Sequence, residues 1–219
     1  SEMCIRDRSM AKNIAADYKV PMAFFSLEMS NVQLVNRLMS NVCEIAGSRI
    51  LNGQLQPDEW ERLDKRVNDL LGAPLYVDET PGLSVFELRT KARRLVREHG
   101  VKIIMIDYLQ LMTTGQRTEN RVQEISSITR NLKIMAKEMN VPIIALSQLS
   151  RAVEKQGNNS SHRPQLSDLR DSGSIEQDAD CVLFLYRDSY YASQNPDGAE
   201  VDADTAECIV AKNRHGETS

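Results

Sequence analysis

The sequence predicts an α/β protein built on a twisted, mostly parallel β-sheet flanked by helices. Short apolar segments of strand length alternate with longer segments in which apolar residues recur at helical spacing. This alternation is typical of β-α-β units, because neighbouring parallel strands need a helical crossover between them. Three of the apolar segments also end directly in polar residues, as buried strands do at the sheet edge where α/β proteins bind ligands. Both observations indicate the same fold class.

The composition is that of a globular protein with one domain and a substantial core, since 41% of the 219 residues are apolar and 26% are charged. A formal net charge of −4 argues against a generally basic surface that coats nucleic acid. The four cysteines are scattered and form no CxxC pair: Cys4, Cys43, Cys181 and Cys208. We therefore expect no zinc site and a cytoplasmic location. No stretch approaches the roughly 18 uninterrupted apolar residues of a membrane span, so we expect none.

The first nine residues, SEMCIRDRS, differ from the rest of the chain because they show no periodicity. We interpret residues 1–9 as a foreign or disordered start and assign residues 10–219 to one domain. Residues 10–16 have the composition of a helix. Residues 20–27 are an apolar run that predicts a buried strand.

A capping-box pattern, Ser30 with Gln33, predicts the start of the next helix. Apolar residues beginning with Val32 and Val35 follow at helical spacing, and Gly47 is expected to end the helix. The residues between Gly47 and Pro57 are then expected to form a loop.

Pro57 predicts the first turn of another helix, and Asp58 and Glu59 in that turn suit the helix dipole. Residues 72–74, Gly-Ala-Pro, end this helix, and residues 75–77 are a short strand candidate.

A turn at residues 80–82 precedes a second capping box, Ser84 with Glu87. The helix that starts there is expected to run to His99, because Gly100 is a typical C-terminal stop.

The segment VKIIMIDYLQLM, residues 101–112, predicts a buried strand that ends in Asp107. A long helix over residues 119–139 follows, and residues 141–146 predict another buried strand, which ends in Ser147-Gln148. The helix is expected to bury its apolar residues at steps of three and four: Val122, Ile125, Ile128, Leu132, Met135 and Met139.

The last third of the chain is more polar. Residues 151–165 are rich in glycine, asparagine and serine and predict a mobile loop. Residues 181–186 and 206–212 predict two strands separated by a turn region around residues 195–198.

Polar residues follow three of the buried strands: Glu28, Asp107 and the pair Ser147-Gln148. Because parallel strands end at one edge of a sheet, these side chains can converge on one site. Phosphoryl transfer to water needs such a set, in which one acid holds Mg²⁺, a second acid polarises the attacking water, and an amide senses the γ-phosphate. The alternative is that these residues only end strands and begin solvated loops.

Five sequence strings together resemble one family. They are FFSLEMS, IIMIDYLQLM, IIALSQLSR, DLRDSGSIEQDAD and VAKNRHG, and they cover the chain from about Met10 to its end. The chain resembles the C-terminal motor domain of DnaB-type replicative DNA helicases, which is a RecA-like P-loop NTPase. The resemblance implies an ATP-dependent helicase that works as a homo-hexamer and moves 5′–3′ on single-stranded DNA. It also implies Mg²⁺ as cofactor, primase and a helicase loader as partners, and a place at replication forks.

The resemblance assigns roles to the three strand ends. Glu28 matches the glutamate that activates the hydrolytic water, Asp107 the Walker B aspartate that supports Mg²⁺, and Gln148 the γ-phosphate sensor. The alternatives are a helix-entry acid beside Ser30 for Glu28 and a polar loop residue for Gln148.

In the C-terminal part, Lys212 and Arg214 match the pair that a neighbouring subunit inserts into the nucleotide site. Arg170, Asp171 and Gly173 match the loop that tracks single-stranded DNA, where the family usually has RESG. The alternatives are two solvated cations and a loop too acidic to bind DNA outside a ring. The segment around residues 117–121 is a candidate for a second DNA loop.

The family's phosphate loop, GxxxxGK[ST], has no counterpart in the sequence. Asp7 stands where the lysine belongs, and the first glycine of the chain is Gly47. The family's collar domain and last strands are absent as well, so we expect a motor domain truncated at both ends. This departure keeps two alternatives open, a non-catalytic RecA-like ring or scaffold module and a related RecA-like ATPase that remodels DNA.

Overall fold

The computed structural model describes residues 9–115, 120–149, 163–187 and 205–218. The chain divides into two compact units. Unit 1 comprises Ser1–Thr118 and Asn131–Ser147, and unit 2 comprises Glu119–Arg130 and Gln148–Ser219. Several predicted features lie outside the described residues: the start before Ser9, the second candidate DNA loop up to residue 119, most of the loop at 151–165, and the turn at 195–198.

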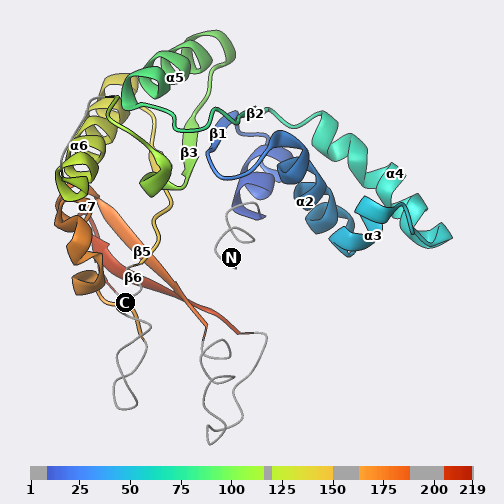
Figure 1. Ribbon diagram of the computed structural model, residues 1–219. Coiled ribbons are helices and arrows are strands. Elements are labelled where there is room, and N and C mark those ends of the chain that lie inside the picture. The colour runs from blue at the N-terminus through green and yellow to red at the C-terminus, as the bar shows by residue number, and fades with distance from the viewer. Residues whose placement is uncertain (1–8, 116–119, 150–162, 188–204, 219) are drawn as a thin grey trace, which may run out of the picture. The chain divides into compact units, whose positions relative to one another are not determined.

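Unit 1 contains a four-stranded parallel sheet, which confirms the predicted fold class (Figure 1). The strands are β1 (Met22–Ser26), β2 (Leu75–Asp78), β3 (Ile103–Asp107) and β4 (Ile143–Ala145). Their order is β2-β1-β3-β4, and every neighbouring pair is parallel. The two central strands, β1 and β3, are two of the three strands that the sequence predicts as buried apolar runs.

The core of unit 1 lies on both faces of this sheet, because all five residues of β1 are buried. On one face Met22 and Phe24 pack with Leu34 and Leu38 of α2 (Asn31–Cys43). The short π-helix η1 (Asn13–Asp17) contributes Ala15 to the same cluster.

On the other face of the sheet lies α5 (Val85–His99), which turns a stripe of small and aliphatic residues inward (Figure 1). Val85, Leu88 and Ala92 of this stripe are at most 3% exposed. The predicted limits of α5 are confirmed, since the Ser84–Glu87 capping box forms and Gly100 adopts the left-handed conformation with φ 63°.

The predicted loop between Gly47 and Pro57 is wrong, because most of it is a helix. α2 already ends at Cys43, where Glu44 takes the left-handed conformation at φ 54°. Gly47 begins the short helix α3 (Gly47–Asn52), whose Ile50 packs against the end of α2. The predicted helix from Pro57 is confirmed as α4 (Pro57–Leu71), and the ion pair between Arg49 and Glu59 joins α3 to it at 2.9 Å.

The apolar spacing also misplaced part of the buried face of α2. Val32 and Val35 are 70% and 46% exposed, while Leu34 and Leu38 form the contact with the sheet. The buried face of α2 is therefore turned by about one residue from the predicted face, so that Leu34, and not Val35, packs against the sheet.

β4 is shorter and less buried than predicted. It covers three residues, of which Ile143 and Ile144 are half-buried and Ala145 is exposed. The physical reason is its position at the edge of the sheet of unit 1, where β3 is its one neighbour among the described strands. The short helix η2 (Leu109–Leu111) follows β3 on the way to this edge.

The long helix α6 (Arg121–Met139) belongs to both units, and its described part begins two residues after the predicted start. Four of its expected core residues are buried: Ile125, Ile128, Leu132 and Met135. Val122 is 45% exposed and Met139 is half-buried, so the expected burial is wrong at both ends of the stripe.

Unit 2 contains η4 (Leu166–Ser172), α7 (Gly173–Asp178), β5 (Cys181–Tyr186) and β6 (Glu207–Asn213). Both predicted strands are confirmed, and they pair with each other in antiparallel orientation. Residues of β5 alternate between exposed and buried, so one face of this sheet forms the core of unit 2, and its buried members are Leu169, Val182 and Phe184.

No helix among the described residues is long and apolar enough to span a lipid bilayer.

Candidate functional site

The carboxyl edge of the sheet in unit 1 brings charged and polar residues together, because all four strands end there. Ser26 and Asp107 are partners in the register of β1 and β3, and the Leu27 N–H donates to the Asp107 carbonyl oxygen over 2.8 Å. Asp107 is only 3% exposed. The peptide bond that follows it is cis. The predicted convergence of Glu28 and Asp107 at one edge follows from this register.

Glu28 lies in a tight turn between β1 and α2, where both of its neighbours are buried. The side chains of Leu27 and Met29 are 8% and 7% exposed, whereas Glu28 is exposed. The Ser26 hydroxyl donates to the Met29 carbonyl oxygen over 2.9 Å and closes the turn. Arg37 contacts the Met29 sulfur at 3.4 Å. The turn is thus anchored on both sides of Glu28, which is itself exposed.

The end of β2 also contributes to this edge, in addition to the three strand ends that the sequence predicts. The backbone N–H of Asn31, the first residue of α2, donates to the Glu79 carboxylate. Glu79 therefore holds the start of the helix that follows the Glu28 turn, together with the capping box of Ser30. In the sequence, the acidic residues Asp78 and Glu79 at the end of the short strand could have indicated this contribution. They place charge at this edge only because β2 pairs with β1.

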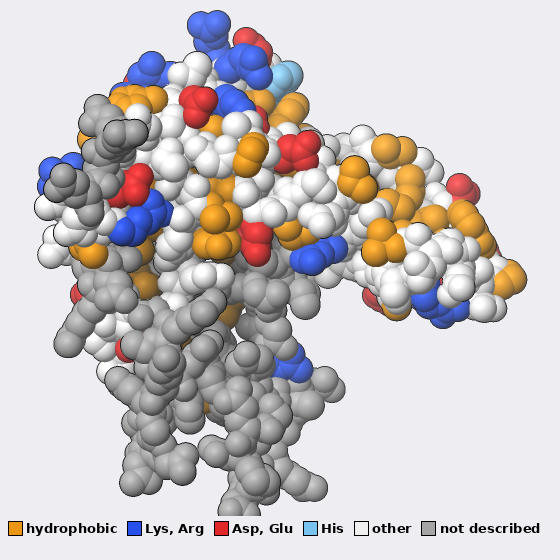
Figure 2. Space-filling view, in the orientation of Figure 1, with side chains coloured by type: hydrophobic (Ala, Val, Ile, Leu, Met, Phe, Trp, Pro, Cys, Tyr) orange, Lys and Arg blue, Asp and Glu red, His pale blue; other side chains and the backbone are white. Residues whose placement is uncertain are grey.

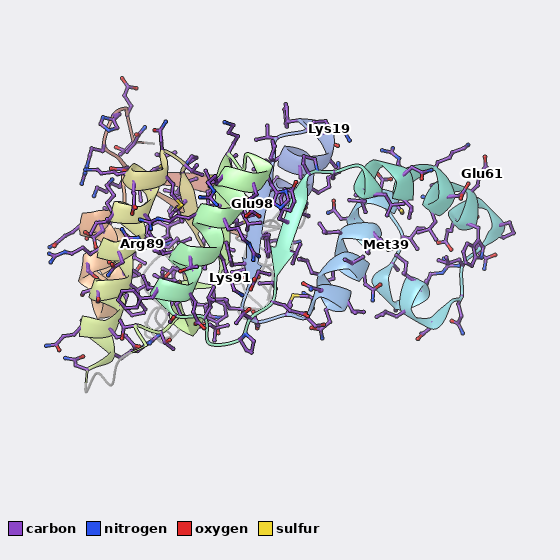
Figure 3. All side chains as sticks on the ribbon, turned by 90° about the horizontal axis from the view of Figure 1, so that it is seen from above. Lys19, Met39, Glu61, Arg89, Lys91 and Glu98 are labelled. Carbon is purple, nitrogen blue, oxygen red and sulfur yellow. The ribbon has the colours of Figure 1, made fainter. Side chains whose placement is uncertain are left out.

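Asp78 and Lys91 form an ion pair at the same edge, with 2.6 Å between the Lys91 Nζ and a carboxylate oxygen. Lys91 also donates to the Thr80 hydroxyl over 2.5 Å, and Figure 3 shows it on α5. Burial alone would raise the pKa of Asp78, but hydrogen bonds from Lys91 and Thr80 outweigh it, so this pKa lies below its usual value. The pair fixes the carboxyl end of β2 to α5.

On the β4 side, two contacts fix the residues that follow the strands. The Leu109 N–H donates to the Leu146 carbonyl oxygen over 2.8 Å. The Gln110 side-chain amide donates to the Ser147 hydroxyl over 2.8 Å. The structure thus brings Glu28, Asp107 and Ser147 to one sheet edge. Gln148 is exposed and belongs to unit 2, so its convergence with them stays a prediction.

In unit 2, Lys212 and Arg214 both lie at the C-terminal end of α7. Lys212 donates to the Glu176 carbonyl oxygen, and Arg214 donates to the Gln177 carbonyl oxygen over 3.2 Å. Arg214 also pairs with Asp180 at 3.2 Å. The last carbonyl groups of a helix have no partners within it and carry partial negative charge, which explains why two cations collect there.

The predicted DNA-binding residues lie at the other end of α7. Gly173 is its first residue, and Arg170 and Asp171 belong to η4 just before it. The side chains of Arg170 and Asp171 lie outside the described part of the structure. Leu169, next to them, is 6% exposed and belongs to the core of unit 2. The segment is therefore anchored to the core one residue before Arg170.

The donor set at the edge of unit 1 fits a magnesium–nucleotide site. A buried carboxylate at the end of a parallel strand is a suitable ligand for Mg²⁺ or its waters, because Mg²⁺ prefers one or two carboxylates and completes its shell with phosphate and water oxygens. Glu28 is exposed at the same edge, and a carboxylate can accept a proton from water. The position predicted for the phosphate loop, around Asp7, lies outside the described residues.

The comparisons with known proteins agree on one family. The sequence model described as "DnaB-like helicase C terminal domain" matches residues 7–219. Among curated proteins, a "Probable replicative DNA helicase" of Trieres chinensis is 49% identical over 210 residues, which are 95% of this chain and 45% of that protein. A "Replicative DNA helicase DnaB" of Geobacillus stearothermophilus is 46% identical over 209 residues, with 95% and 44% covered.

Two solved structures share the fold. One, described as an ATPase domain, has a TM-score of 0.88 at 35% sequence identity. The match covers 98% of this chain and 74% of the chain in that structure. A second, of a "DnaB-Like Replicative Helicase And Its Interactions With Primase", has a TM-score of 0.86 at 36% identity, with 95% and 49% covered. The RecA-like fold is thereby confirmed. The chain spans less than half the length of these two curated relatives, and it belongs to the DnaB-like helicase C-terminal domain family.

Proposed function

We propose that this chain is the motor domain of an ATP-dependent replicative DNA helicase. It works in a homo-hexameric ring that moves 5′–3′ along single-stranded DNA and unwinds duplex DNA. The observation that carries the proposal is the buried Asp107 in register with the strand that leads to the exposed Glu28. The curated relatives are replicative DNA helicases, and one similar structure concerns interactions with primase, which supports primase as a partner. A helicase loader is the second partner that we propose.

In the proposed reaction, bound Mg²⁺-ATP supplies the phosphoryl group that is transferred to water. Asp107 would hold the metal or its waters, because it is buried at the end of β3. Glu28 orients the attacking water and accepts its proton. The contacts of Met29 and Asn31 hold the Glu28 turn in place, so little rearrangement is needed at the moment of reaction.

In unit 2, the proposed partner contacts meet on one short helix. Lys212 and Arg214, proposed to reach the nucleotide of a neighbouring subunit, bind the C-terminal carbonyls of α7 in this chain. The loop proposed to hold single-stranded DNA, with Arg170, Asp171 and Gly173, leads into the N-terminal end of α7. If Arg214 leaves α7 to reach a nucleotide, the change is passed through the six residues of this helix to the DNA loop. Gln148, the proposed γ-phosphate sensor, completes this set.

A second candidate function is favoured by a specific feature of the sequence. The chain has no GxxxxGK[ST] segment, and an acid at position 7 would repel phosphate. A non-catalytic ring or scaffold module that kept the fold would share this feature.

A calorimetric titration with Mg²⁺-ATP separates the two functions. Residues 1–8 have the length of the phosphate-loop pattern, so GxxxxGKT can replace them without an insertion. We expect the present chain to bind ATP more weakly than micromolar and the restored chain to bind in the micromolar range. In the restored chain, Asp107→Asn should remove the Mg²⁺ dependence of binding. A restored chain that still fails to bind ATP, although it is folded, supports the scaffold module.

A further inference from the structure

One helix of unit 1 carries a concentration of positive charge, of which the candidate nucleotide site uses only Lys91. α5 contains five arginine or lysine residues and two glutamates, in a chain whose formal net charge is −4. Figure 2 shows lysine and arginine side chains gathered where Figure 1 places α5.

Three of the five cations form ion pairs with carboxylates of unit 1. Lys91 pairs with Asp78 of β2. Arg89 and Arg93 both pair with Glu138 of α6, and Figure 3 shows Arg89 on the side of α5 that faces this helix. Arg93 nevertheless keeps 54% of its side chain exposed.

The remaining two cations, Arg94 and Arg97, are exposed and make no ion pair within the described part of the chain. Of the two glutamates, Glu87 caps the start of the helix, where it accepts from Ser84. Glu98, labelled in Figure 3, is the one carboxylate beside the exposed arginines on the same helix. The outer side of α5 is therefore positively charged.

An exposed aromatic ring lies on the same side of the helix. Phe86 is 58% exposed, and Arg93, Arg94 and Arg97 follow it at seven, eight and eleven positions, which places all four on the side opposite the buried Leu88. The stretch from Phe86 to Arg97 covers about 16 Å of helix. We call these four residues the α5 face.

We propose that the α5 face binds single-stranded nucleic acid, as a second contact separate from the loop proposed in unit 2. Arginine binds phosphate oxygens through its planar fork of N–H groups, and an exposed aromatic ring stacks on an unpaired base. An acidic protein segment would match the charge of this surface but would offer no unpaired base for Phe86 to stack on. The face is built wholly from unit 1 and does not rest on the role proposed for Arg170.

The test measures the affinity of the 219-residue chain for a short fluorescent oligothymidylate by anisotropy, at salt concentrations from about 50 to 200 mM. The test variant is Arg94→Gln/Arg97→Gln. The matched control is Arg62→Gln/Lys65→Gln on α4, which removes the same charge from two exposed residues that pair with Asp58 and Glu61. Glutamine keeps the helix propensity in both.

Because the test variant removes two phosphate-binding side chains, the slope of log affinity against log salt should fall by about 1.4, since each phosphate bound on a single strand contributes about 0.7. The control should keep the parent slope. Phe86→Ala should weaken binding of the oligothymidylate by about fivefold or more and leave binding of a blunt duplex unchanged.

Equal slopes for the test and control variants would overturn the proposal. An equal effect of Phe86→Ala on duplex would overturn the assignment to single strands, and displacement of the oligonucleotide by polyglutamate without any effect of Phe86→Ala would assign the face to an acidic protein. Arg170→Gln, measured in parallel, tests the loop in unit 2. If Arg170→Gln does not weaken binding, the unit 2 loop does not bind the oligonucleotide, and the result for the α5 face still stands.

Discussion

The carboxyl edge of the sheet in unit 1 and the end of α7 in unit 2 both hold charged residues of the proposed motor, but they hold them differently. In unit 1 the anchors are buried: Ser26 is 1% and Asp107 3% exposed, and backbone hydrogen bonds join the strand ends. In unit 2 the anchors are exposed, since the Arg214 and Asp180 side chains are 46% and 49% exposed. The difference suits the two tasks that we propose, one that needs fixed geometry for ATP hydrolysis and one that exchanges partners between subunits.

The largest expected effect is on stability, and it compares a buried residue of the sheet in unit 1 with an exposed residue of the sheet in unit 2. Phe24→Ala in β1, buried on both faces, should lower the free energy of unfolding by about 3–5 kcal/mol, because it leaves a cavity in the core of unit 1. Leu185 of β5 is 41% exposed, and Leu185→Ala should lower the free energy of unfolding by less than about 1 kcal/mol. Urea unfolding followed by circular dichroism measures both. Similar losses would mean that the open face of β5 is as tightly packed as β1.

A smaller effect should come from the half-buried pair Asp78–Lys91 and should depend on pH. Because the folded-state pKa of Asp78 is lowered, its contribution is full above the unfolded value of about 3.9 and is lost as the pH falls through the folded value. Asp78→Asn should therefore cost about 1 kcal/mol at neutral pH. The difference from the parent should vanish in acid. Thermal unfolding at a series of pH values checks this, and a difference that persists in acid contradicts the role of the pair.

The smallest effect on stability should come from Arg214→Ala. Its ion pair with Asp180 is exposed, and exposed pairs contribute about 0–1 kcal/mol and are screened by salt. We expect a change below about 1 kcal/mol that shrinks further at high salt, measured by urea unfolding. A loss as large as that of Phe24→Ala would show that Arg214 is a structural anchor of unit 2, which would contradict an exchangeable contact.

Features that depend on adjacent residues could be predicted from the sequence. The capping boxes at Ser30 and Ser84 and the buried strand that ends in Asp107 are confirmed, because each signal lies within a few residues. The helix α3 was missed because a six-residue helix has too few apolar positions to show a period, and its Ile50 is ordered by contacts with α2.

The candidate site could be predicted only in part, for a related reason. Glu28 and Asp107 follow strands whose pairing is implied by their apolar runs. Glu79 and Lys91 belong to the site only because β2 pairs with β1, and strand order depends on contacts far apart in the sequence. Local patterns therefore identify the chemistry at the strand ends but not the residues that hold it in place.

In the motor that we propose, the Glu28 turn is the hydrolytic part of the nucleotide site. The direct test is Glu28→Gln in the chain with the restored phosphate loop, with Glu61→Gln on α4 as the matched control, an exposed glutamate of the same unit. We expect ATP hydrolysis to fall by about 100-fold or more in Glu28→Gln, while calorimetry shows unchanged ATP binding and the control keeps both. Loss of ATP binding in Glu28→Gln, or hydrolysis at the parent rate, would contradict the account.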